Sequence, residues 1–149
     1  MRRFFLFTVC TLVGLMCASC DEDLSSITGP TPNLEPTFSS IQTNIFNMTD
    51  SSGRLACIQC HTDAGRTPSG NLVLLEGRSY QQIVGRGSTG KPGATLVIPG
   101  DAENSYIIHK LEGNADIVGQ RMPRGNGPFL TEGQILVIRQ WIKDGAPNN

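Results

Sequence analysis

Residues 57–61 of this 149-residue chain read Cys57-Ile58-Gln59-Cys60-His61. This C-x-x-C-H spacing is the pattern to which haem is covalently attached. Two thiols separated by two residues can form thioethers with the two vinyl groups of one haem, and the adjacent imidazole can then ligate its iron. The sequence therefore predicts one covalently bound haem, haem c, attached through Cys57 and Cys60, with His61 as its proximal ligand.

The same five residues also admit a zinc half-site, a redox-active dithiol or a chance match. Zinc would need two further ligands, yet the other cysteines lie at or before Cys20, and His109 is the only other histidine. A dithiol oxidoreductase places its motif where a strand meets a helix in a βαβ unit, and no such pattern surrounds residues 57–61. Haem attachment is therefore the favoured interpretation.

The N-terminus has the features of a secretion signal over residues 1–19. Met1-Arg2-Arg3 precedes an apolar run that ends at Met16 and is too short for a stable membrane-spanning helix. Ala18-Ser19-Cys20 resembles a bacterial lipobox, in which the cysteine is acylated and becomes the first residue of the mature chain. We expect an exported protein, lipid-anchored through Cys20 in the cell envelope, either facing the periplasm or in the outer membrane. An ordinary cleaved signal would instead release a soluble protein.

Composition divides the remainder into a tether and one domain. Residues 20–37 contain the expected lipidation site, Cys20, and then a stretch rich in Ser, Thr and Pro without apolar periodicity. This composition predicts a flexible tether. Residues 38–149 are long enough for one domain with a modest core. The whole chain has 12 Lys and Arg against 13 Asp and Glu, so no nucleic-acid partner is expected. Seventeen glycines and nine prolines favour short helices joined by long loops.

Apolar spacing and capping residues predict a helix directly before the haem motif. It begins near Ser39, which forms a capping box with Gln42, and it ends before Ser51-Ser52-Gly53. Its apolar stripe contains Phe38, Ile41, Ile45 and Met48.

Further helices are expected over residues 79–84, 105–111 and 131–144. The last one has a capping box formed by Thr131 and Gln134, and Gly145 followed by Pro147 ends it. Its apolar stripe contains Ile135, Ile138 and Ile142, with Trp141 at the margin. The sequence therefore predicts an all-α fold.

Four short stretches follow the haem motif in a definite order. They are Val97-Ile98-Pro99-Gly100-Asp101, Ser105-Tyr106-Ile107-Ile108, Met122-Pro123 and Trp141-Ile142-Lys143-Asp144-Gly145-Ala146. This order resembles the class I cytochrome c domain of bacterial monohaem lipoproteins, and the resemblance covers about Phe38 to Ala146. It implies a cytochrome c-like fold of short helices and long loops wrapped around one haem. The terminal helix would cross the first helix beside the haem, with Ile138, Trp141 and Ile142 against Ile41 and Ile45.

The resemblance makes Met122 the expected sixth ligand of the iron. Pro123 favours an extended backbone at Met122, which suits a loop that presents a side chain inward. A thioether is a soft ligand that favours ferrous iron, so His/Met ligation raises the reduction potential relative to bis-His ligation. His109 and Met48 are the alternative ligands, and Met122 could instead simply pack in a loop.

The function expected from these features is that of a membrane-anchored monohaem cytochrome c, which carries single electrons between transient donor and acceptor proteins. No catalytic acid, base or nucleophile can be placed, so an enzyme is not expected. The alternatives are a haem-based gas or redox sensor, a dedicated electron-transfer subunit of an envelope oxidoreductase, and a haem-free interaction lipoprotein.

Two further features bear on partners. Gly85-Arg86-Gly87-Ser88-Thr89-Gly90 matches G-x-G-x-x-G, but Pro92 follows where a phosphate-binding helix would have to grow, so no nucleotide is expected. Arg121 and Arg124 flank Met122 and, with Lys91, could steer an acidic redox partner. The arginines could equally pair with haem propionates.

Overall fold

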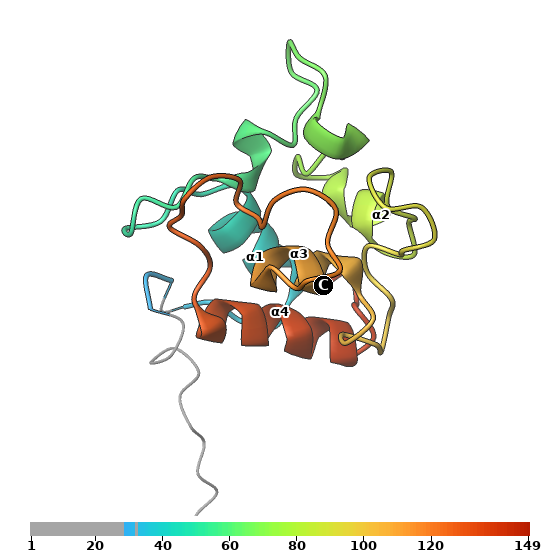
Figure 1. Cartoon of the computed structure of the whole chain (residues 1–149). Helices are drawn as coiled ribbons and strands as arrows, with labels where there is room; N and C mark the ends of the chain where they lie inside the picture. The colour runs from blue at the N-terminus through green and yellow to red at the C-terminus, as the bar shows by residue number, and fades with distance from the viewer. Residues whose placement is uncertain (1–28, 32) are drawn as a thin grey trace, which may run out of the picture.

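The computed structural model describes residues 29–31 and 33–149, drawn in colour in Figure 1. Its α-helices are α1 (Phe38–Ile41), α2 (Ser79–Ile83), α3 (Tyr106–Glu112) and α4 (Glu132–Lys143). A π-helical turn, Gln42–Phe46, continues α1, and two 3₁₀ turns cover Cys57–Gln59 and Ser69–Asn71. The described residues form isolated β-bridges and no strand, which confirms the expected all-α class for this part of the chain. The signal sequence and Cys20 lie outside it.

The first helix begins earlier than the sequence predicted. Thr37 is its N-cap, because the Thr37 backbone is extended and its hydroxyl accepts a hydrogen bond from the Ser40 amide at 3.2 Å. The predicted capping box of Ser39 and Gln42 is therefore wrong. Gln42 is instead buried, and its Nε2 donates to the Leu74 carbonyl at 2.9 Å.

This helix also ends earlier, because its second half is a π-helical turn that is capped by Asn47. A π turn holds more residues than an α turn, so positions after it no longer follow the 3.6-residue stripe. Ile45 is still buried, but the Met48 side chain is 49% exposed. The prediction that Met48 belongs to the apolar stripe is wrong.

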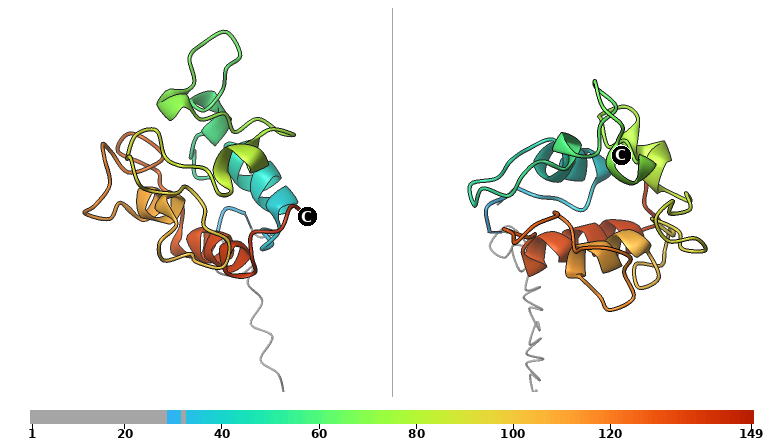
Figure 2. Two further views of the ribbon diagram at one scale, coloured as in Figure 1. Left: turned by 90° about the vertical axis from the view of Figure 1, so that its right-hand side faces the viewer. Right: turned by 45° about the horizontal axis from the view of Figure 1, so that its top comes forward.

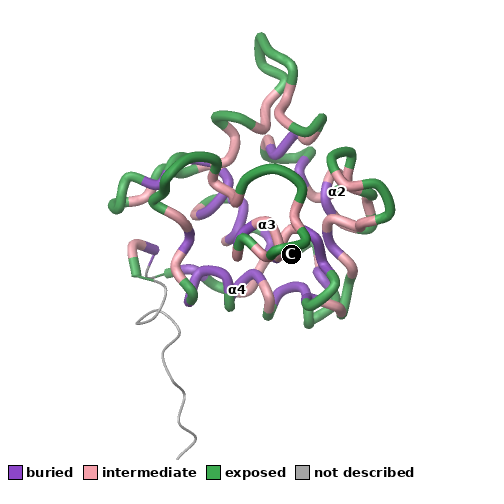
Figure 3. The backbone as a smooth tube through the Cα atoms, viewed as in Figure 1, coloured by how far each residue is buried: buried purple, intermediate pink, exposed green. Residues whose placement is uncertain are grey.

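The last helix follows the sequence closely. Thr131 and Gln134 form the reciprocal capping box, and Gly145 adopts a φ of 93° directly after the helix. Buried and exposed positions alternate along α4 as its amphipathic spacing requires (Figure 3). Trp141 is fully buried, so it belongs to the core-facing stripe and not to its margin.

α4 organises the hydrophobic core beside the first and third helices (Figure 2). The Phe38 and Trp141 ring centroids are 5.5 Å apart, and Ile41, Ile45 and Ile138 belong to the same buried cluster. Arg139 on α4 also donates to the Glu112 carboxylate at the end of α3. Burial of this apolar face provides most of the stability of such short helices, which are marginal on their own.

The packed unit begins before Phe38, where the sequence placed the domain boundary. Leu34 is 3% exposed and belongs to the core cluster, and Thr31 accepts a hydrogen bond from Gln134 Nε2 at 2.8 Å. The described part of the expected tether therefore packs against α4. No helix within residues 29–31 and 33–149 is long and apolar enough to cross a membrane.

Candidate functional site

One cavity of about 680 Å³ brings the predicted site residues together. Cys57, Cys60 and His61 line it from the segment after the first helix, and Met122 lines it from the loop between α3 and α4. The volume lies within the roughly 300–1,000 Å³ that cofactor and small-molecule pockets occupy. Two segments far apart in sequence thus contribute a thiol pair, an imidazole and a thioether to one cavity.

The walls of the cavity are largely apolar and come from most parts of the fold. Aliphatic side chains reach it from the first helix, from both sides of α2, and from α3; among them are Ile45, Leu72, Leu74, Ile83, Leu96 and Leu111. Such walls suit a ligand with extended apolar surface, because contact with them removes that surface from water.

The charged residues of the cavity are all basic. Arg66, Arg86, Lys110 and Arg124 line it, and no Asp or Glu among residues 29–31 and 33–149 does. Arg86 donates from Nη2 to the Asn71 carbonyl at 3.2 Å, but its Nη1 is buried without a hydrogen-bond partner among the described residues. A buried donor of this kind costs free energy unless it is paired, so the site favours a ligand with an anionic group near Arg86.

A tight turn presents the two cysteines. The amides of Cys60 and His61 both donate to the Cys57 carbonyl, at 3.2 and 3.0 Å. Cys57 Sγ donates to the Ile45 carbonyl at 3.4 Å, and both cysteines are free thiols. Burial raises the pKa of the Cys57 thiol to about 11. A redox-active dithiol needs a lowered thiol pKa, so the environment argues against that alternative.

His61 has the hydrogen bonding of a metal-ligating histidine. Its Nδ1 lies 3.0 Å from the Ser69 carbonyl, which can only accept, so Nδ1 carries the proton and Nε2 keeps its lone pair. Burial lowers the pKa of His61, which favours the neutral imidazole. A ring nitrogen that donates to a backbone carbonyl is the usual arrangement of a ligating imidazole.

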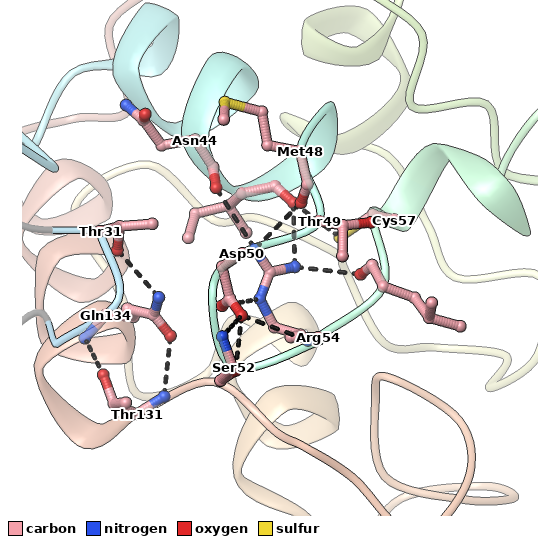
Figure 4. Close-up of polar contacts among 12 residues, drawn as sticks. Thr31, Asn44, Met48, Thr49, Asp50, Ser52, Arg54, Cys57, Thr131 and Gln134 are labelled. Atoms are coloured by element: carbon pink, nitrogen blue, oxygen red, sulfur yellow. Dashed lines mark hydrogen bonds and ion pairs between the residues drawn. The ribbon is translucent and has the colours of Figure 1, made fainter.

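A buried arginine fixes the chain immediately before Cys57 (Figure 4). Arg54 forms an ion pair with Asp50, with 2.9 Å between Nε and Oδ2. Its terminal nitrogens donate to four backbone carbonyls. Those of Asn44 and Ile45 lie at the end of the first helix, which leaves them without helical partners, and those of Met48 and Leu55 lie in the segment that follows. Arg54 therefore joins the end of the first helix to the segment that leads to Cys57.

The two alternative ligands lie away from the cavity. Met48 does not line it. His109 does not line it either, and both its ring nitrogens face acceptors: Nδ1 lies 2.9 Å from the Asp116 carboxylate and Nε2 lies 2.7 Å from the Glu103 carbonyl. These two acceptors, the Glu103 carbonyl above all, raise the pKa of His109 despite partial burial. Of the candidate sixth ligands, the structure places only Met122 at the cavity.

The flanking basic residues separate into two groups. Arg121 donates from Nε to the Leu111 carbonyl at 2.7 Å, and its guanidinium lies 4.2 Å from the centre of the Phe129 ring, outside the cavity. Lys91 pairs with Asp116 at 2.6 Å and does not line the cavity. Arg124 is exposed at the cavity rim. Of the three, only Arg124 is placed to meet a ligand or partner there.

The other sequence alternatives find little support in these residues. Within residues 29–31 and 33–149, no three His, Cys, Asp or Glu side chains gather as a metal site would require. Residues 85–90 are followed by a turn, in which Ala94 donates to the Lys91 carbonyl, and not by a helix. They contribute to the cavity wall instead.

The chain's residues fit haem on chemical grounds. Haem is flat and apolar, with two carboxylates on one edge, which matches apolar walls and an unpaired buried Arg86 nitrogen. Cys57 and Cys60 would provide the attachment thiols, and His61 and Met122 would provide a nitrogen and a sulfur donor for the iron. Comparison with family models, with curated proteins and with solved structures finds no match.

Sequence reasoning missed Arg54, Arg86 and Lys110 as residues of the site. Arg86 lies inside the G-x-G-x-x-G match, a pattern that is defined by its glycines. Arg54 lies three residues before Cys57, and the residues around it do not distinguish it from an exposed arginine. Only Arg86 carried a weak signal, because Pro92 after residues 85–90 excludes a helix there and favours a loop.

Proposed function

We propose that this chain is a class I cytochrome c that holds one haem c and transfers single electrons. The observation that carries the proposal is one apolar cavity lined by both the C-x-x-C-H turn and Met122. Haem, when bound, supplies an iron whose two oxidation states differ by one electron.

The residues of the cavity divide the work of holding this group. Cys57 and Cys60 would anchor it through thioethers, while His61 and Met122 would provide the nitrogen and sulfur donors to its iron. Arg86 would pair with a haem carboxylate, since its Nη1 has no other partner among the described residues. His61 and Met122 would both ligate as neutral groups, and a thioether favours the ferrous state, so this donor pair would support a reduction potential above that of bis-His sites.

The fold supports transfer with little rearrangement. The Ser69 carbonyl fixes the His61 ring, and Arg54 fixes the segment before Cys57. Close-packed side chains such as Ile83, which is fully buried, limit movement of the wall. We place no catalytic acid, base or nucleophile here and propose a carrier, not an enzyme.

The proposal extends to the cell envelope on sequence grounds alone, because residues 1–28 lie outside the described residues. We propose export, cleavage before Cys20 and acylation of Cys20, with transient redox proteins as partners and neither nucleic acid nor nucleotide as ligand. Electron-transfer proteins typically form small and transient contacts with their partners.

The test is to express the full chain with a cytochrome maturation apparatus and to record a pyridine haemochrome spectrum and an intact mass. We expect one haem c per chain, with a mass that equals the lipidated polypeptide plus one haem. The double variant Cys57→Ala/Cys60→Ala should lack covalent haem. A colourless wild-type protein, with the mass of polypeptide and lipid alone, would overturn the proposal.

A further inference from the structure

Lys110 on α3 bonds to the loop that carries Met122 through both its side chain and its backbone. Its Nζ donates to the Val118 carbonyl at 3.0 Å and to the Gln120 carbonyl at 2.5 Å. Its own carbonyl accepts from the Met122 amide at 2.8 Å. One residue therefore holds the loop at three points, the last of them at the proposed ligand itself.

Two neighbours on α3 complete this attachment. The Tyr106 hydroxyl accepts from the Val118 amide at 2.9 Å, and the Leu111 carbonyl accepts from Arg121 Nε at 2.7 Å. α3 is itself fixed, since Ile108 and Leu111 are buried in the core cluster beside α4. α3 thus gives residues 118–122 a rigid support.

The chain on the other side of Met122 has no comparable support. No hydrogen bond joins residues 123–129 to any residue in the part of the chain that the structure describes. In this stretch, the Phe129 ring contacts the Arg121 guanidinium. The position of Met122 therefore depends mainly on the bonds that precede it, and Lys110 makes most of them.

We propose that Lys110 is the positioning residue for the Met122 thioether, an inference that rests on the proposed function. Charged donors make stronger hydrogen bonds than neutral ones. Without the ammonium group, the Val118 and Gln120 carbonyls lose their donor and residues 118–120 lose their tie to α3. Met122 is then held less firmly at the cavity, and an external ligand displaces it more easily.

The experiment compares the haem-loaded full chain with Lys110→Met, Lys110→Arg and a matched control, Lys143→Met. Lys143 is exposed in the last turn of α4, far in sequence from the loop. Carbon monoxide is titrated into the ferrous proteins, and the Fe–S charge-transfer band is recorded in the ferric proteins. Lys110→Met should raise the carbon monoxide affinity about tenfold and weaken the band. Lys110→Arg, which keeps charge and donors, and Lys143→Met should remain close to the wild type.

Two outcomes would overturn the positioning role. One is a Lys110→Met protein with wild-type carbon monoxide affinity and an intact band, even if its reduction potential shifts, because that shift would reflect charge alone. The other is an equal effect in Lys143→Met. If Lys110→Met does not accumulate, Lys110→Gln is judged by the same two readouts. Absence of haem from the wild type would overturn the proposed function as well, so the two failures are distinguishable.

Discussion

Replacing Arg54 with methionine should lower the free energy of unfolding by about 3–5 kcal/mol, the cost of removing one partner from a buried ion pair. The side chains of Arg54 and Asp50 are 0% and 2% exposed. The variant leaves the Asp50 carboxylate buried without its cation, and it removes the Arg54 donor from four backbone carbonyls, of which that of Ile45 keeps the Cys57 thiol. Since small domains have only about 5–15 kcal/mol of stability, this loss is a large share of the total.

A second ion pair in the same chain provides the control. Arg78 and Asp63 lie 2.8 Å apart, but their side chains are 51% and 40% exposed. Arg78→Met should therefore leave the unfolding midpoint near that of the wild type. Arg54→Lys keeps the charge and loses the planar set of donors, so its stability should lie between those of the wild type and Arg54→Met.

Urea unfolding followed by the fluorescence of Trp141, the single tryptophan, measures these differences. The double variant Asp50→Asn/Arg54→Met should lose less than the sum of the two single variants, because neither charge is then left alone. A loss under about 1 kcal/mol for Arg54→Met, the scale of an exposed pair, would refute the assignment of a buried pair.

The acid side of the stability curve gives an independent check on the same pair. Burial alone would raise the pKa of Asp50, but hydrogen bonds from Ser52 and Arg54 and the Arg54 charge hold it below its usual value. A depressed pKa contributes stability that is present above the ordinary value and is lost as pH falls through the folded-state value. Arg54→Met should therefore reduce this acid-dependent part of the unfolding free energy.

Three further measurements address the cavity and its surroundings. Met122→Ala should abolish the ferric Fe–S charge-transfer band and admit carbon monoxide, and a band that persists would exclude Met122 as the ligand. Arg86→Met should cost the haem-loaded protein about 1.5–3 kcal/mol in urea unfolding, the range for a charged hydrogen bond, and equal stability would count against a carboxylate near Arg86. The Glu103 carbonyl and the Asp116 carboxylate raise the pKa of His109, so protonated His109 stabilises the folded state. This stabilisation is complete below about pH 6.5 and is lost as pH rises through the folded-state pKa. NMR titration should place the His109 pKa above 6.5 in the wild type and lower it in Asp116→Asn, and an unchanged value in that variant would disprove the pairing.

The parts of this structure that sequence could predict depend on neighbouring residues. The C-x-x-C-H spacing and the capping box of Thr131 and Gln134 are local, because their members interact within one turn. The core position of Ile138 follows from helical period. The same period wrongly placed Met48 in the apolar stripe, because a π-helical turn intervenes and neither apolar spacing nor capping residues mark that turn.

The residues that sequence missed are defined by tertiary contacts. Arginines are mostly exposed, so the full burial of Arg54 could not be expected from its type. It follows instead from the orphan carbonyls at the end of the first helix. Lys110 acquires its role from carbonyls eight and ten residues away on a loop without regular structure. Helical spacing along α3 gives no information on which loop a lysine reaches.

The cavity connects the site to the stability of the whole fold. α1, α2 and α3 have four, five and seven residues, which is too short for helices that are stable without tertiary contacts. The cavity walls come from the first helix, the C-x-x-C-H turn, the segments around α2, α3 and the Met122 loop. A group that fills the cavity makes non-covalent contacts with all of these segments, and because those contacts exist only in the folded state they stabilise it. Under the proposed function, haem therefore acts as part of the core, and a substitution such as Leu74→Ala in the cavity wall should weaken both haem packing and folding.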